Sequence, residues 1–124
     1  MVFLYSEQVP ECLVMKEILR ELAQKMPTRK FMQSKATNVV ENYRDEDTPA
    51  LIFYKDGEMT NQIAGKKARD IFGGVRMNIH TVTYVLSKEL GFLDVAFEDD
   101  PRDSLKTFNA YIHHKKKFLG ADED

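Results

Sequence analysis

The first residues that could do chemistry lie near the start of the chain, in the stretch YSEQVPEC (5–12). Cys12 is the only cysteine in the sequence, and it is expected in the first turn of a helix. A thiolate is the nucleophile of thiol chemistry, and a helix N-terminus lowers the pKa of a cysteine. A two-cysteine exchange cycle needs a partner thiol, and Val9 occupies the position three residues earlier. We therefore expect this stretch to keep the geometry of a thiol site without its redox chemistry.

Other side chains capable of catalysis or metal binding lack the neighbours that their chemistry requires. His113 and His114 are adjacent, so their side chains diverge on a helix, and the sequence offers no evident third ligand. Gly73-Gly74 lacks the further glycines and the lysine of a phosphate-binding loop. No serine, histidine and aspartate set has local support for nucleophilic catalysis. We therefore expect no enzyme activity, no metal site and no cofactor.

The composition restricts the class of protein. A chain of 124 residues that is 43% hydrophobic can form one domain with a real core. Charged residues make up 31% and nearly balance, with a net charge of −2, which argues against nucleic-acid binding. No apolar run is long enough for a membrane span, and MVFLYSEQ lacks the features of a signal peptide. With one cysteine and no internal disulfide, we expect a soluble cytoplasmic protein without membrane or nucleic-acid partners.

Alternating strands and helices are expected to position these residues. The apolar run ALIFY (50–54) fits a central strand covered on both faces. Pro10–Met26 carries apolar residues at helical spacing behind a proline that suits the first helical turn. Asp56-Gly57 is a hairpin signal, and Asn78 is a helix N-cap candidate. The other expected elements are strands over Val2–Tyr5, Lys30–Ala36 and Glu58–Ala64, a short helix or loop over Thr37–Tyr43, and a helix from Asn78 to Gly91.

This order of elements predicts an α/β fold with one mixed sheet. A crossover helix joins the first two strands, which should therefore be parallel, and a tight turn makes the last two antiparallel. We expect helices on both sides of the sheet. The pattern weakens from Asp94 onward, so we expect a domain over 1–93 and an extension over 94–124 that is partly helical or disordered.

The element order, the helix-opening cysteine and a proline before an apolar strand resemble the thioredoxin fold. YSEQVPEC aligns without a gap with the pattern W-A-x-W-C-x-x-C, which sets Val9 at the nucleophile position and Cys12 at the buried resolving position. Thr48-Pro49 matches the family's cis-proline dipeptide, and LIFYKDGEM (51–59) matches its central strand, turn and edge strand. The resemblance implies a mixed sheet of about four strands flanked by helices, lacking the usual first strand and helix.

A closer likeness is to the C-terminal domain of phosducin-like proteins, in particular the class of chaperonin co-factors. FLYSEQVPEC (3–12) resembles their strand and x-P-x-C stretch that has lost the redox pair. FGGVRMNI (72–79) is similar, with an insertion, to their F/C-G-G-x-N-hydrophobic segment. Asn42-Tyr43, the stretch EDDP (98–101) and the acidic end ADED (121–124) also match. The family's N-terminal helical region has no counterpart in this sequence.

The resemblance implies a non-catalytic co-chaperone that works with the cytosolic chaperonin during folding of actin, tubulin and related clients. Two alternatives stay open: a regulator that binds G-protein βγ subunits, and a monothiol redox protein that uses Cys12. In the thioredoxin fold, the cis-proline loop faces the helix N-terminus and forms a protein-contact surface. The residues expected at this surface are Gln8, Val9, Pro10, Cys12, Thr48 and Pro49. Acidic residues that could meet a basic partner are Asp94, Glu98, Asp99, Asp100 and Asp103, together with ADED.

Overall fold

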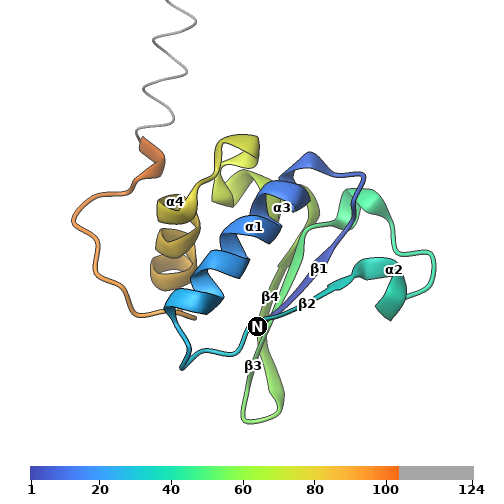
Figure 1. Cartoon of the computed structure of the whole chain (residues 1–124), viewed down its shortest axis with the longest axis horizontal. Coiled ribbons are helices and arrows are strands. Elements are labelled where there is room, and N and C mark those ends of the chain that lie inside the picture. The colour runs from blue at the N-terminus through green and yellow to red at the C-terminus, as the bar shows by residue number, and fades with distance from the viewer. Residues whose placement is uncertain (104–124) are drawn as a thin grey trace, which may run out of the picture.

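In the computed structural model, which describes residues 1–103, four strands form one mixed sheet (Figure 1). The spatial order of the strands is β2-β1-β3-β4. β1 is parallel to β2 and antiparallel to β3, and β3 is antiparallel to β4. The predicted pairing directions are therefore confirmed. The strands are β1 (Val2–Tyr5), β2 (Met32–Lys35), β3 (Ala50–Lys55) and β4 (Glu58–Ala64).

Helices cover the two faces of the sheet unequally, as Figure 1 shows. One face packs against α1 (Pro10–Lys25), α3 (Gly65–Phe72) and α4 (Ile79–Tyr84), which continues as a π-helical stretch over Val85–Glu89. The other face holds a small cluster around Leu4, Ala36 and Ala50, covered by the four-residue helix α2 (Ala36–Val39). The predicted α/β architecture with flanking helices is confirmed, and the fold of residues 1–103 is thioredoxin-like, with four strands and no counterpart of the usual first strand and helix among these residues.

The main core lies between the sheet and the three helices of the first face. Phe3 of β1 pairs in register with Leu51 of β3, and both side chains are fully buried. Side chains alternate between the faces of a strand, so Leu4 and Ala50 point to the second face. The prediction that the run ALIFY is covered on both faces is only partly correct. Its second face is incompletely covered, because Tyr54 is 50% exposed and Ile52 is partly exposed.

Most helix ends and turns lie where local sequence signals predicted them. Asn78 caps α4 in a capping box with Thr81, because its side chain accepts hydrogen bonds from the backbone amides of residues 80 and 81. Gly91 has φ of +64° after the π-helical stretch, as expected for a C′ residue. The hairpin turn has Asp56 and Gly57 in the left-handed region, with φ of +54° and +82°.

Helix α3 was missed in the sequence because it starts without a capping side chain. Its first residue, Gly65, has φ of +67°, and its amide donates to the carbonyl oxygen of Pro49 at 3.0 Å. A Cβ at Gly65 would lie 2.9 Å from the Glu46 carbonyl oxygen, so the close approach of the two backbones requires glycine. Its inward face is formed by the buried Ala68 and Phe72, four residues apart, with the partly buried Ile71 beside them.

Part of the expected C-terminal extension packs against the domain. Phe97 meets Tyr84 edge-on, with ring centroids 5.3 Å apart. Arg102 donates to the Ile71 carbonyl oxygen at 2.8 Å and forms ion pairs with Asp100 and Glu89. The division at residue 93 stays a prediction. Residues 104–124 of the expected extension, with the His113-His114 pair and the ADED end, lie outside the described residues.

Candidate protein-binding site

The N-terminus of α1 presents three residues of the expected surface. Val9 is the N-cap of α1 and is partly buried, and its carbonyl oxygen accepts from the Cys12 amide at 3.0 Å. Pro10, at the first helical position, and Gln8 are both exposed. The Gln8 amide donates to Ser6 Oγ at 3.1 Å, which fixes the loop between β1 and α1. Gln8, Val9 and Pro10, hereafter the helix-mouth surface, form a small surface on a hydrogen-bonded backbone.

Cys12 lies beneath this surface and is fully buried. Burial raises the pKa of the Cys12 thiol above its usual value, and the Ser6 backbone and the Thr48 side chain lower it only in part by hydrogen bonding. The nearby carboxylate of Glu11 raises the pKa further, and the Arg69 guanidinium lowers it. The thiol is therefore protonated at neutral pH and inaccessible, whereas a redox cysteine needs an exposed thiolate.

The cis-proline loop faces the thiol from the start of β3. The Thr48-Pro49 peptide bond is cis, as the thioredoxin resemblance implied. Thr48 Oγ1 donates to the Asp45 carbonyl oxygen at 2.6 Å, and both Thr48 and Pro49 are buried. Arg69 of α3 donates to the carbonyl oxygens of Thr48 at 2.6 Å and Glu46 at 3.1 Å. The guanidinium therefore ties the loop to α3.

The structure brings the six expected residues together at one end of the sheet, but in two layers. Cys12, Thr48 and Pro49 form a buried layer. The resemblance implied this for Cys12, whereas Thr48 and Pro49 were expected to line the surface. All three support the helix-mouth surface from below and offer no side-chain area to a partner. Sequence reasoning missed Arg69 as part of this arrangement. Its only sequence signal was membership of a basic group with Lys66 and Lys67.

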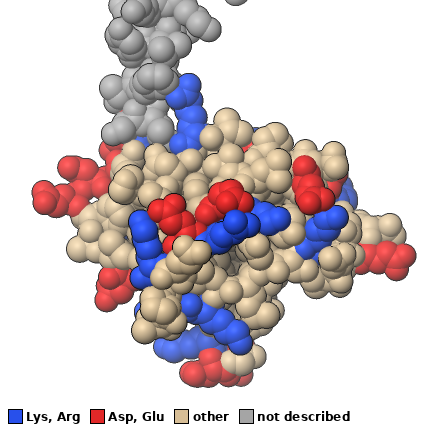
Figure 2. All heavy atoms as spheres, viewed as in Figure 1, with Lys and Arg blue, Asp and Glu red and all other residues tan. Residues whose placement is uncertain are grey.

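The acidic residues that could contact a basic partner differ in their exposure to solvent. Asp94, Glu98 and Asp99 are exposed, whereas Asp100 is partly buried and bound to Arg102 at 2.6 Å. The Asp103 amide donates to the Asp100 carbonyl oxygen at 3.1 Å, as part of the turn that holds Arg102. Acidic and basic side chains are interspersed on the face that Figure 2 shows, without a large patch of one sign. Asp94, Glu98 and Asp99 remain the candidates for a charged contact.

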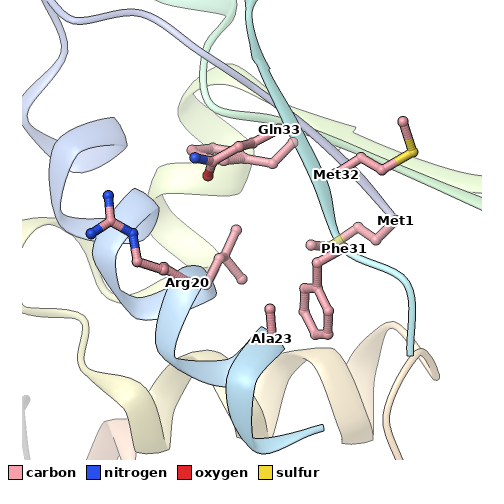
Figure 3. A pocket seen from close by; sticks show the side chains of 8 residues that line it. Met1, Arg20, Ala23, Phe31, Met32 and Gln33 are labelled. Carbon is pink, nitrogen blue, oxygen red and sulfur yellow. The ribbon is translucent and has the colours of Figure 1, made fainter. Parts of the chain in front are cut away.

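An apolar cavity of about 230 Å³ lies between α1 and the start of β2, and no sequence pattern predicted it. Figure 3 shows Ala23 of α1 and Phe31 at its wall, with Met1 beside them and the Met32 side chain pointing away from α1. β2 is an edge strand within the described sheet. Unpaired edges invite pairing with other chains, and the strand order makes β4 the other edge, so self-association is expected at one of these two strands.

No metal or membrane feature occurs in the described part of the chain. Within residues 1–103, no cluster of three or more histidine, cysteine or acidic side chains could hold a metal ion. No helix there has the length and apolar character of a membrane span. His80 is exposed near the start of α4 and has no other potential ligand grouped with it.

Thiol exchange provides a direct check of the Cys12 assignment. We expect the purified protein to reduce insulin, with a dithiol as reductant, no faster than its Cys12→Ser variant, because the thiol is buried and has no resolving partner. We also expect a colorimetric thiol reagent to react with Cys12 much faster in denaturant than in buffer. Insulin turnover above that of Cys12→Ser would contradict the absence of redox catalysis.

Comparison with known proteins gives phosducin-like relatives, although no protein-family model matches the sequence. Phosducin-like protein 3 of Danio rerio is 33% identical over 103 residues, which are 83% of this chain and 41% of the relative. The mouse protein of the same name is 30% identical over the same shares of both chains. Phosducin-like protein 2 of Dictyostelium discoideum is 26% identical over 84% of this chain and 42% of its own length. The chain thus spans about two fifths of the length of these relatives.

Proposed function

Since this chain is a phosducin-like protein with a thioredoxin-like domain, we propose that it acts as a non-catalytic protein-binding module. In this proposal it is a cytoplasmic co-chaperone that binds the cytosolic chaperonin and modulates the folding of actin- and tubulin-type clients. The observation that carries the proposal is Val9 at the N-cap of α1, where the attacking thiol of a reductase would stand. The scaffold of a thiol site is kept, while its one thiol is buried below the surface.

The mechanism is binding by a preorganised surface. The helix-mouth surface rests on the buried layer of Cys12, Thr48 and Pro49, and Arg69 holds the loop that supplies that layer. A rigid surface loses little conformational entropy when a partner docks, so its few apolar contacts count fully toward affinity. Exposed charges such as Asp94, Glu98 and Asp99 would mainly set the association rate and its dependence on salt.

Substituting Val9 by aspartate tests the surface without weakening the helix. Val9 makes no side-chain capping bond, whereas aspartate is a favoured N-cap residue, with a gain of about 0.5–2 kcal/mol over a residue that cannot cap. This gain offsets the loss of the partial packing of Val9. We expect Val9→Asp to fold normally and to bind purified cytosolic chaperonin about tenfold more weakly, because a charge replaces an apolar contact. The measurement is co-migration with the chaperonin on native gels over a range of concentrations.

The matched control is Met59→Asp, which places the same charge at an exposed position of β4 next to the hairpin. That end of the sheet is opposite to the helix mouth, because β3 runs antiparallel to β1. We expect this variant to bind like the unmodified chain. Absence of chaperonin binding by the unmodified protein, or capture of purified G-protein βγ instead, would overturn the proposed function. An equal loss of chaperonin affinity in Val9→Asp and Met59→Asp would overturn the role of the helix-mouth surface.

A further inference from the structure

A polar crevice lies beyond the C-terminal ends of the parallel strands β1 and β2, which lead to helices on opposite faces of the sheet. After β1 the chain enters α1 on one face of the sheet, and after β2 it enters α2 on the other face. Ligands of open α/β sheets bind outside the carboxyl ends of strands at such a point of divergence. A cavity of about 180 Å³ occupies this place, with Ser6, Glu7, Lys35, Tyr43 and Asp45 among the residues that line it. We call it the divergence crevice.

The exposed Asp45 carboxylate lines the crevice and is fixed there by one hydroxyl group of the protein. Its Oδ1 accepts from Ser6 Oγ at 2.7 Å, and the Ser6 oxygen in turn accepts from the Gln8 amide at 3.1 Å. Within residues 1–103 this hydroxyl is the one hydrogen-bond partner of the Asp45 side chain, and no cation pairs with it. A carboxylate offers about four acceptor sites, so Asp45 can accept further hydrogen bonds from a ligand.

The neighbouring charges favour a cationic ligand over an anion. Lys35 Nζ lies 3.1 Å from Glu7 Oε1, so the one lysine of the crevice is already paired. Two carboxylates and one ammonium leave a formal charge of −1 on the crevice lining. Arg44 does not neutralise Asp45, because its guanidinium contacts Asp47 at 3.3 Å and Glu46 at 3.9 Å.

An aromatic wall completes the crevice. Tyr43 packs against the cluster of Leu4, Ala36 and Ala50, and its hydroxyl donates to the Asp47 carbonyl oxygen at 3.3 Å, so its ring is held in place. Tyrosine faces attract cations, and a guanidinium can stack on a ring while its N–H groups reach a carboxylate in a fork. An ammonium group would make only a point contact with the same carboxylate.

We propose that the divergence crevice binds an arginine side chain presented by a partner protein, with Asp45 as the acceptor. The partner is the one that the proposed function requires, and the proposal adds that its contacting segment is basic and docks next to the helix-mouth surface. Gln8 links the two places, because it belongs to that surface and its amide holds Ser6 in the crevice.

A titration followed by backbone amide NMR tests the proposal with a defined probe. The probe is the peptide N-acetyl-Ala-Arg-Ala-amide, and the comparison peptide carries citrulline, which is neutral and almost isosteric, in place of arginine. We expect saturable shifts at the amides of Ser6, Gln8 and Asp45, and binding of the citrulline peptide about tenfold weaker. Shifts that do not saturate, or equal binding of both peptides, would overturn the proposal.

Two matched variants separate the Asp45 contact from general electrostatics. Asp45→Asn keeps an oxygen for the Ser6 hydroxyl and removes only the charge, and its amide spectrum reports whether the fold is retained. Asp56→Asn makes the same change in the exposed hairpin turn at the opposite end of the sheet, where asparagine tolerates the φ of +54°. We expect Asp45→Asn to bind the arginine peptide at least tenfold more weakly than the unmodified chain and Asp56→Asn to bind it equally well. Equal affinity of the two variants for this peptide would refute the site. The chaperonin assay with Val9→Asp is independent of this result, so the two proposals can fail separately.

Discussion

Replacing Phe3 by alanine should lower the free energy of unfolding by about 3–5 kcal/mol, the range for removing a fully buried aromatic side chain. Phe3 is completely buried in the centre of the sheet, opposite Leu51 and 5.7 Å from the Tyr5 ring by centroids. Domains of this size are stable by about 5–15 kcal/mol, so the variant should be only marginally folded. The measurement is urea unfolding followed by circular dichroism.

Tyr54→Ala is the matched control for Phe3→Ala. Tyr54 is an aromatic residue of the adjacent strand β3, but half of its surface is exposed. Removal of the Tyr54 ring should therefore lower the free energy of unfolding by about 1 kcal/mol or less, since surface substitutions usually have small effects. Similar losses in the two variants would mean that the core is not centred on Phe3 and would contradict the described packing of β1.

Arg69→Met should have the second largest effect, through the cis-proline loop. The methionine keeps most of the aliphatic side chain but removes the donors to the Thr48 and Glu46 carbonyl oxygens. Hydrogen bonds from charged groups contribute about 1.5–3 kcal/mol, and Thr48 is fully buried, so its carbonyl oxygen would lose its partner. We expect Arg69→Met to lower the free energy of unfolding, measured in urea, by about 2 kcal/mol. If the helix-mouth surface depends on the loop, chaperonin affinity should fall as well.

Lys67→Met controls for the loss of one positive charge on α3. Lys67 is exposed, and no hydrogen bond or ion pair involves its side chain within the described residues. We expect the change in its free energy of unfolding to stay within about 0.5 kcal/mol. An Arg69→Met variant as stable as Lys67→Met would show that the guanidinium does not hold the loop.

Elements with local signals could be predicted from the sequence. The strand over 58–64 and the N-cap at Asn78 were predicted where the structure has them, because turn residues and capping side chains act within a few positions along the chain. The strand predicted over 30–36 is shorter, spanning Met32–Lys35, where it pairs with β1. Helix α3 was missed, because Gly65 starts it through a contact with Pro49, sixteen residues earlier in the sequence.

The sequence by itself determined that Val9 stands where a second thiol would be needed, and with it that a two-cysteine cycle is impossible. It also determined the α/β order of elements apart from α3, because hydrophobic periodicity is a local property of the chain. Only the tertiary structure decided that Thr48 and Pro49 are buried together with Cys12 and that Arg69 holds their loop. The divergence crevice and its Asp45 carboxylate also depend on the folded arrangement, since Ser6 and Asp45 are 39 positions apart. Burial and long-range hydrogen bonds arise from segments that meet only on folding, so no local pattern carries them.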